Sequence, residues 1–371
     1  MRRSTIVLVL AAFAVAARAQ AGPPVKQLPK DADPNDWVSY YEYAVKVFSE
    51  SPDKAYDAFR WASRIDPTRA EPFQGMWSAF WMKHRDPFLD YLDGAKEVIE
   101  RPDVIHNDSV LWHAFERNPF VNEALEMVIW KAISQFGYHS DFARGMVAYA
   151  NQSYETSVTL LWSSLNEEPA HYWRLATIAS VYAQMRKYDS TAIAMEMLIA
   201  KLREIDKSQL VYLYQSKEMA YYALGLTYAQ LGRIPESREA QGHALEENIA
   251  FAPAHVALGQ LAVSMRDTAT ARSEYSLAVE LEPKDGAIRY WYGAALLRAQ
   301  APADAITQLK EAIRLEPYFA DPWMTLGLAY TTQHDTANAV AAYSEFLNRA
   351  PRRSTNIAIA QQRIAALKHS P

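Results

Sequence analysis

The C-terminal half of the chain carries a pattern of apolar and polar positions that repeats at a fixed interval of about 34 residues from position 218 onward. Within each repeat, apolar residues recur at the 3.6-residue spacing of amphipathic helices. Four glycines keep the interval: Gly225, Gly259, Gly293 and Gly327. Two sets of alanines and one set of prolines keep it as well: Ala271, Ala305 and Ala339; Ala244, Ala278 and Ala312; and Pro283, Pro317 and Pro351. A fixed period of this length predicts one small structural unit that is copied and stacked.

The small residues and the prolines of this unit predict how its two helices pack and end. We number positions within each unit from its first residue, at 218, 252, 286 and 320. Gly or Ala at positions 8, 20 and 27 allows two helix backbones to approach closely, where a larger side chain would hold them apart. Proline disfavours helical geometry in the residue before it, so Pro283 and Pro317 are expected to stop the second helices of their units. A single helix hairpin leaves an apolar face in water, so neighbouring hairpins must stack.

The repeat resembles the tetratricopeptide repeat family. In the unit that begins at Ala320, the residues that carry the resemblance are Trp323, Leu326, Gly327, Tyr330, Ala339, Tyr343, Phe346 and Pro351. Units beginning at Ala252 and Gly286 match at most of these positions, and the unit from Glu218 matches at fewer. The resemblance implies an all-α fold, a right-handed superhelical solenoid of stacked antiparallel helix hairpins.

Upstream of residue 218 the match weakens, and over residues 70–137 no repeat register is present. We expect a signal peptide over 1–19, a flexible leader over 20–35, an N-terminal helical region over 36–137, degenerate units over 138–217, four units over 218–353 and a capping helix over 354–371. The N-terminal region should hold one degenerate unit (36–69) and then helices near 72–84, 88–100 and 119–136. In the unit from Glu218 the closing proline comes late, at Pro253, which predicts a longer second helix.

The N-terminus has the features of a secretory signal. Arg2 and Arg3 precede an apolar run from Ile6 to Ala17, and the small residues around Arg18 predict cleavage after Ala19. A bilayer span needs roughly 20 apolar residues, more than this run contains, although an uncleaved membrane anchor is the alternative. We therefore expect an exported protein, periplasmic or secreted, with no membrane span in the mature chain.

Composition narrows the classes of function. Cleavage would remove three arginines and no acids, which changes the formal net charge from −5 to −8 and gives no basic surface for nucleic acid or anionic lipid. The absence of cysteine excludes disulfides, thiolate chemistry and lipid attachment at an N-terminal cysteine.

The residue types used in catalysis do not occur in catalytic patterns. His106, Asp108 and His113 lack the spacing of a metal site, as do His139 and Asp141. The acidic pairs fall at the ends of second helices: Glu167-Glu168 and Glu246-Glu247. Neither a glycine-rich phosphate loop nor a Gly-x-Ser-x-Gly elbow is present. The sequence predicts a protein that is not an enzyme and has no catalytic residues, metal or cofactor; a catalytic N-terminal part is the weaker alternative.

The family resemblance implies that the first helices line a concave groove through positions 2, 5, 9 and 12. The candidate partner-binding residues are Met219, Tyr222, Leu226, Val256, Gln260, Tyr290, Leu297, Met324 and Leu328. One branch of the family grips a terminal carboxylate with Lys, Asn and Arg at such places, and that activity is not expected here. An apolar groove suits an amphipathic helix, an extended apolar peptide or another subunit, with Tyr222, Tyr290 and Met324 as anchors. A helix of the same chain, for example from 70–137, is the alternative occupant.

A second class of function rests on the aromatic residues of the N-terminal part. Fourteen aromatics lie between Trp37 and Tyr91, among them Trp61, Trp77 and Trp81, and exposed rings of this kind can stack on sugars of the cell envelope. Most of them fall at helical spacing, which favours a role in the core. We therefore interpret the chain as an exported, non-catalytic scaffold for a protein or peptide partner, with carbohydrate binding as the alternative function and self-association left open.

Overall fold

The computed structural model describes residues 28–48, 50–69, 71–83, 140–167, 172–206 and 217–369, and every regular element within these ranges is an α-helix. The expected signal peptide and the expected helices at 88–100 and 119–136 lie outside the described residues. The helices are α2 (Trp37–Val47), α3 (Pro52–Ile65), α4 (Glu71–Lys83), α9 (Asp141–Ala150), α10 (Tyr154–Glu167), α11 (Arg174–Gln184), α12 (Tyr188–Asp206), α13 (Lys217–Gln230), α14 (Ile234–Glu247), α15 (Ala252–Ser264), α16 (Thr268–Leu281), α17 (Gly286–Arg298), α18 (Pro302–Leu315), α19 (Asp321–Thr332), α20 (Thr336–Arg349) and α21 (Asn356–His369).

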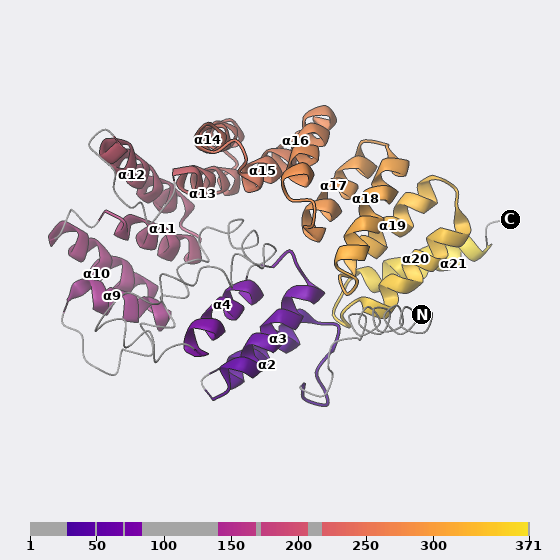
Figure 1. The fold of residues 1–371 in the computed structure, drawn as a ribbon, viewed down its shortest axis with the longest axis horizontal. Coiled ribbons are helices and arrows are strands. Elements are labelled where there is room, and N and C mark those ends of the chain that lie inside the picture. Colours follow the sequence, from indigo (N-terminus) through magenta and orange to yellow (C-terminus); the bar gives the residue numbers. More distant parts are fainter. Residues whose placement is uncertain are drawn as a thin grey trace, which may run out of the picture.

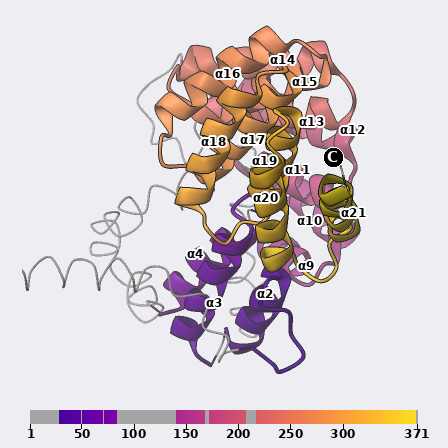
Figure 2. The ribbon, with the colours of Figure 1, turned by 90° about the vertical axis from the view of Figure 1, so that its right-hand side faces the viewer.

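The hairpins are stacked in sequence order. Each helix from α9 to α21 packs against the helices next to it along the chain, within a hairpin and between hairpins. Figure 1 shows them following an arc from α9 and α10, over α13 and α14, to α20 and α21, with α2–α4 between the ends of the arc. In the view turned by 90°, α2 and α3 lie beneath the C-terminal hairpins (Figure 2). The predicted all-α solenoid is confirmed.

The recurring glycines lie where the first helix of a unit crosses the second helix. A Cβ atom on Gly293 would be 2.7 Å from Cγ of Leu309, and one on Gly327 would be 2.6 Å from Cδ1 of Tyr343. The same relation to the residue 16 positions later holds at Gly145, Gly225 and Gly259. The recurring alanines are at most 2% exposed: Ala244, Ala271, Ala278, Ala305, Ala312 and Ala339. The predicted close approach of the two helices is therefore present in every unit from α13 to α20.

Helix ends follow the local sequence, with one exception to the prediction. The helices α16 and α18 end two residues before Pro283 and Pro317, as expected. The prediction of a longer second helix in the unit from residue 218 is wrong, because α14 has 14 residues, the same length as α16. Asn248 adopts an extended conformation that ends α14, and Pro253 lies in the first turn of α15 rather than closing the unit.

The chain turns between the first and second helix of a unit through one residue with positive φ. These residues and their φ angles are Gln152 (60°), Arg186 (56°), Gly232 (72°), Arg266 (61°), Gln300 (58°) and His334 (60°). Successive members are one repeat period apart except on either side of residues 207–216, where the structure is not described. Gly232 is the glycine of this series, so the other turns hold a side chain in a conformation that L-residues disfavour.

The N-terminal hairpin, which we define as α2 and α3, contacts the loop that joins α18 to α19. Arg64 Nε forms an ion pair of 3.2 Å with Glu316 Oε2, and the Glu316 side chain is 4% exposed. Trp61 packs edge-to-face on Tyr318, with 5.4 Å between the ring centroids. The Arg64 side chain also donates to the backbone carbonyl of Leu315. Polar and aromatic contacts therefore join segments that are far apart in the sequence.

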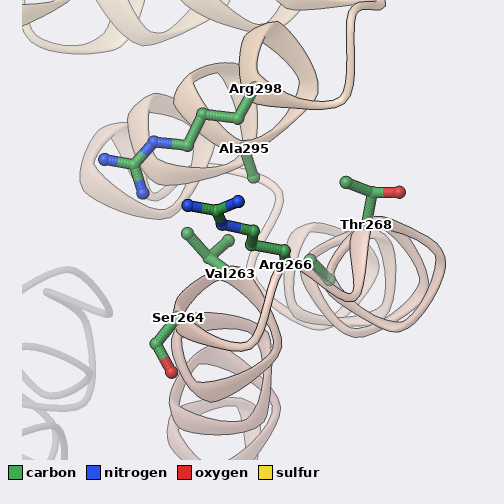
Figure 3. Close-up of a pocket in the computed structure, with 7 residues that line it drawn as sticks. Val263, Ser264, Arg266, Thr268, Ala295 and Arg298 are labelled. Carbon is green, nitrogen blue, oxygen red and sulfur yellow. The ribbon is translucent and has the colours of Figure 1, made fainter.

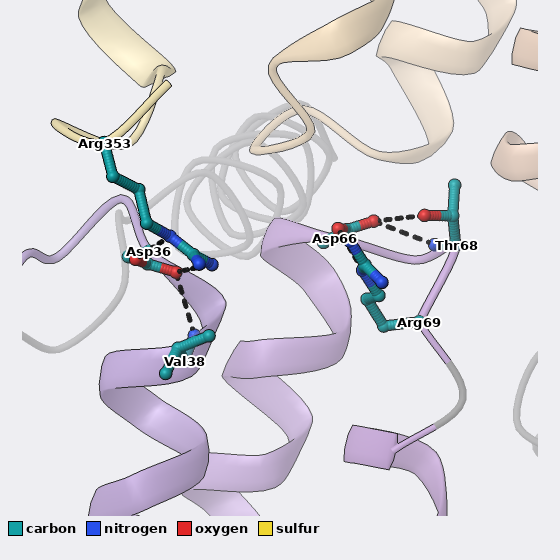
Figure 4. Close-up of polar contacts among 6 residues, drawn as sticks. All are labelled: Asp36, Val38, Asp66, Thr68, Arg69 and Arg353. Carbon is teal, nitrogen blue, oxygen red and sulfur yellow. Dashed lines mark hydrogen bonds and ion pairs between the residues drawn. The ribbon is translucent and has the colours of Figure 1, made fainter. Parts of the chain in front are cut away.

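A second set of contacts joins the residues before α2 to the loop between α20 and α21. The side chain of Asp36 both caps α2, by accepting from the backbone N–H of Val38, and pairs with Arg353 at 2.6 Å (Figure 4). The Asn35 side chain donates to the carbonyl of Asn348 at 3.0 Å. The N-terminal hairpin is thus held at the last units of the solenoid from two sides.

The last helix covers the end of the stack, as the sequence predicts. Ala360 is fully buried, and Ile357, Ile364 and Leu367 pack half-buried against the core cluster that contains Phe346. The outer face of α21 is mixed, with Gln361 and Gln362 exposed beside Ile359, which is 41% exposed. Such a helix protects the apolar face that a terminal repeat would otherwise leave in water.

Gly293→Leu should lower the free energy of unfolding by roughly 1–3 kcal/mol or more, because the added side chain must displace Leu309 and separate α17 from α18. Gly242→Ala in α14 is the matched control, since a Cβ there meets nothing within 4 Å. This control should raise the free energy of unfolding by about 0.5–1 kcal/mol, because alanine is more favourable than glycine inside a helix. Chemical denaturation of the two variants measures both effects, and an unchanged midpoint for Gly293→Leu would show that the helices do not pack closely at this position.

Gly232→Ala should destabilise the protein by roughly 1 kcal/mol, because alanine pays the left-handed backbone cost that glycine avoids. At the equivalent turn, Gln300→Gly should stabilise it by a smaller amount, since glycine relieves that cost but gains freedom in the unfolded chain. Denaturant midpoints of the two variants should therefore move in opposite directions. Shifts of the same sign would contradict the role assigned to φ at these turns.

Arg64→Glu should weaken docking of the N-terminal hairpin on the α18–α19 loop by about 1–2 kcal/mol of docking free energy. The reason is that the substitution places a like charge beside the buried Glu316 carboxylate. The control is Arg60→Glu, the same charge change one turn earlier on the exposed face of α3. As the chain has no cysteine, dyes attached to Asp57→Cys and Thr307→Cys report the separation of α3 and α18 by energy transfer. A second, more distant population is expected with Arg64→Glu alone, and equal distributions for both variants would refute the contact.

Candidate functional site

The first helices form the layer on which all nine predicted partner-binding residues lie. First helices of neighbouring units contact each other, α13 with α15 and α17 with α19, as expected for the inner layer of a curved stack. Two of the nine residues are buried, Tyr222 at 4% exposure and Val256 at 3%. These two side chains belong to the core and present no surface to a partner in this structure.

The other seven residues keep solvent-accessible surface. Tyr290 is half-buried and Gln260 is exposed. We define the apolar strip as the accessible apolar side chains on the first helices: Met219, Leu226, Leu297, Met324 and Leu328. Leu328 is the most open of them, with 37% of its surface exposed. The sequence-predicted site is thus a mixture of core residues and an accessible apolar row.

Two phenylalanines that sequence analysis did not name explain the burial of the tyrosines. Phe251, which precedes α15, packs edge-to-face on Tyr222 with 5.5 Å between the ring centroids. Phe319, before α19, packs in the same way on Tyr290 at 5.1 Å. Both members of the second pair lie two repeat periods after those of the first. This shared spacing could have been recognised in the sequence. It indicates aromatic contacts between successive units, and not tyrosine side chains that are free to bind a partner.

The surroundings of Tyr290 show how near the N-terminal hairpin comes to the first helices. The pKa of Tyr290 is raised to about 12, first by burial and then by the nearby carboxylates of Asp321 and Asp66. Asp66 follows α3 directly, so the hairpin brings a negative charge close to α17 and α19. The N-terminal hairpin thus comes close to the first helices from another part of the chain. Residues 84–137, which make up most of the 70–137 segment considered above, lie outside the described residues.

The pKa of Asp321 also responds to the approach of the N-terminal hairpin. Its pKa is raised, first by the protein atoms that surround the carboxyl group and then by the Asp66 carboxylate, while Arg69 lowers it. Asp321 is nevertheless exposed on one side. Protein atoms that do not touch a carboxyl group can still reduce its solvation and raise its pKa.

A cavity of about 510 Å³ lies where the unit of α15 and α16 meets the unit of α17 and α18. Its lining residues are Val263, Ser264, Arg266, Thr268, Ala271, Ala295 and Arg298. Figure 3 shows the guanidinium groups of Arg266 and Arg298 turned into the same space, above Val263 and beside Ala295. Val263 falls on position 12 of its unit, but neither arginine was a candidate in the sequence, because the two come from different units and fall outside positions 2, 5, 9 and 12.

Aromatic platforms for sugar rings are not seen in the described part of the chain. The tryptophans whose side chains are described, Trp37, Trp61, Trp162, Trp173, Trp291 and Trp323, are all half-buried. Two of them, Trp37 and Trp61, pack edge-to-face on tyrosines rather than forming a coplanar pair. The side chains of Trp77 and Trp81 lie outside the description.

The other side chains that chemistry would use have structural partners or are not described. Glu246 and Glu247 pair with His243 and Lys217, as suits a solvated helix end. In the residues that the structure covers, no group of three His, Asp or Glu is arranged to hold a metal ion. His106, Asp108, His113 and His139 lie outside those residues. The helices that are described include none both long and apolar enough to cross a bilayer.

Comparison with known proteins agrees with the geometry. The tetratricopeptide repeat family model matches residues 220–248 and 252–285. Comparison with curated protein sequences gives no match. The chain therefore contains tetratricopeptide repeats within an all-helical solenoid.

Several solved structures are similar to this chain. YrrB, described as a TPR protein with an unusual peptide-binding site, is 17% identical with a TM-score of 0.43, over 54% of this chain and 96% of that one. The C-terminal part of a TPR repeat-containing protein from Cytophaga hutchinsonii is 14% identical with a TM-score of 0.48, over 62% and 96%. MamA from Desulfovibrio magneticus RS-1 is 14% identical with a TM-score of 0.42, over 48% and 94%.

Proposed function

We propose that the protein is an exported scaffold that binds a protein or peptide partner on the apolar strip of its first helices. The observation that carries this proposal is the strip itself. Apolar side chains on α13, α17 and α19 stay accessible, with Leu226 and Leu328 at the same position of their units, although nearby alanines and glycines of these helices are buried. Accessible apolar rows on one side of a rigid scaffold are typical of surfaces that bind other proteins.

The spacing of the strip favours a helical or extended segment as the ligand. Leu297 and Met324 lie on successive first helices, α17 and α19, which contact each other. A partner segment lying across both helices would cover apolar area from two units at once. The tryptophans give no comparable support to carbohydrate binding, because those whose side chains are described are all half-buried, and Trp37 and Trp162 contact tyrosines.

Export and the absence of catalysis are further parts of the proposal. The basic and apolar N-terminus supports export, and the acidic mature composition is compatible with a protein that works outside the cytoplasm. Tetratricopeptide repeats support a binding role rather than a chemical one.

A matched pair of leucines tests the strip. Leu328 on α19 and Leu277 on α16 are 37% and 39% exposed, but the first lies on a first helix and the second on a second helix. A photo-reactive leucine analogue at each position, followed by irradiation in an extract of the source organism, should trap a specific partner at position 328 and not at 277. Trapping of the same proteins at both positions would contradict the proposal.

The trapped partner then allows an affinity measurement. Leu328→Glu should weaken binding by roughly tenfold or more, because a charge would face the apolar side of the ligand. Leu277→Glu should leave the affinity unchanged, and the melting temperatures of the two variants check that both are folded. An equal loss in both would assign the effect to general destabilisation.

A further inference from the structure

Two arginines face one cavity at the boundary between successive units. Arg266 lies in the turn after α15, and Arg298 is the last residue of α17. Both residues are exposed, and both line the cavity of about 510 Å³ (Figure 3). Among the residues that the structure describes, no carboxylate pairs with either guanidinium group. Within the described part of the chain, two positive charges therefore line one cavity without a paired carboxylate, although the formal net charge of the sequence is −5.

The acidic side chains close by in the sequence are already engaged. Asp267 caps α16 through its side chain. Glu274 accepts from His255 at 2.7 Å, and Asp304 pairs with Arg272 at 3.2 Å. Of the described residues, these acidic neighbours therefore leave the positive potential of the cavity available to an anionic ligand.

A structural role at the helix ends does not account for both arginines. The C-terminal ends of α15 and α17 carry partial negative charge, which favours a cation near each of them. An arginine can interact with a helix C-terminus while its guanidinium group points into water. Two guanidinium groups placed in this way would not repel each other. Turning both groups toward one cavity instead places two sets of N–H donors beside the same space, and guanidinium groups bind oxyanions through such donors.

The cavity also borders the apolar strip. Arg298 directly follows Leu297, a member of the strip. Burial raises the pKa of Tyr290, and the positive charge of Arg298 lowers it in opposition, so this charge lies within electrostatic reach of the Tyr290 hydroxyl. The cavity floor is formed by small apolar side chains, Val263, Ala271 and Ala295, which leaves room for the stem of a ligand side chain.

We propose that Arg266 and Arg298 bind a carboxylate carried by the partner, an acidic side chain at the border of an amphipathic segment whose apolar face lies on the strip. This inference rests on the proposed function for the identity of the ligand, but the anion site itself does not. A helix with Asp or Glu beside its apolar stripe supplies both contacts at once, because residues three and four apart lie on one face. The same chemistry is offered by free carboxylates in solution, so the two sources need separate experiments.

The first experiment uses succinate as the probe and the full chain as the protein. Arginine Nε–Hε NMR signals are assigned with Arg266→Lys and Arg298→Lys, and succinate is titrated against sodium chloride of equal ionic strength. Saturable shifts of these two signals with succinate alone would support the site. Shifts that do not saturate, or that chloride reproduces, would overturn it.

The double variant Arg266→Gln/Arg298→Gln is the control. Glutamine already occupies the equivalent turn at Gln300 and Gln152, so the backbone conformation is retained while the charge is removed. Succinate should no longer shift signals of cavity residues such as Thr268 in this variant. Retained, saturable shifts would place the anion elsewhere and refute the assignment.

The second experiment uses the partner trapped at position 328. The double variant should bind it roughly tenfold to a hundredfold more weakly, as expected for lost charge-assisted hydrogen bonds, and the effect should fall as salt is raised. Arg272→Gln, at an arginine that already pairs with Asp304, is the matched control and should bind normally. An unchanged affinity of the double variant, with the succinate site intact, would show that the cavity takes a free anion and not the partner. Failure to trap any partner would instead count against the proposed function and leave the succinate result standing.

Discussion

Close contact between the glycine at position 8 of the units from α13 to α20 and the residue 16 positions later is the constraint on which the rest of the structure depends. It brings first and second helices together so tightly that a single methyl group on Gly293 would overlap with Leu309. With this distance fixed, each hairpin presents a nearly identical face to the next, so that successive hairpins stack in one sense and keep their first helices in one layer. The apolar strip and the arginine cavity exist because corresponding positions of different units are thereby brought together.

The unit of α13 and α14 shows that this constraint is geometric rather than strictly apolar. Here Gln241 occupies the position that holds Tyr275 or Leu309 in later units, and it is fully buried. Its amide donates to the carbonyl of Tyr222 at 3.2 Å, while the Ser237 hydroxyl donates to the carbonyl of Gly225 at 2.7 Å. Hydrogen bonds to the backbone of α13 offset the cost of burying these polar groups. A unit that departs from the family pattern can therefore keep the same packing.

The sequence was sufficient for what depends on local spacing and insufficient for what depends on contacts between distant segments. Helix pairs, the small packing positions and the capping helix follow from the helical period and from the longer repeat period, and they were predicted. The burial of Tyr222 was missed because its partner Phe251 lies in the short linker that follows the early end of α14. The docking of the N-terminal hairpin was missed because no period links Arg64 to Glu316. Arg266 and Arg298 escaped notice because they belong to two units, and their common direction depends on how the units stack.

Opposing electrostatic effects connect the N-terminal hairpin to the proposed site. The pair of Arg64 with the nearly buried Glu316 holds the hairpin in place, whereas Asp66 approaches Asp321 and helps to raise its pKa. Since docking raises this pKa, the docked state binds the proton of Asp321 more tightly, so docking strengthens as the pH falls through the pKa of that carboxyl group and weakens as the pH rises. Asp66 and Arg298 also act in opposite directions on the pKa of Tyr290, because a nearby carboxylate raises it and a nearby guanidinium lowers it.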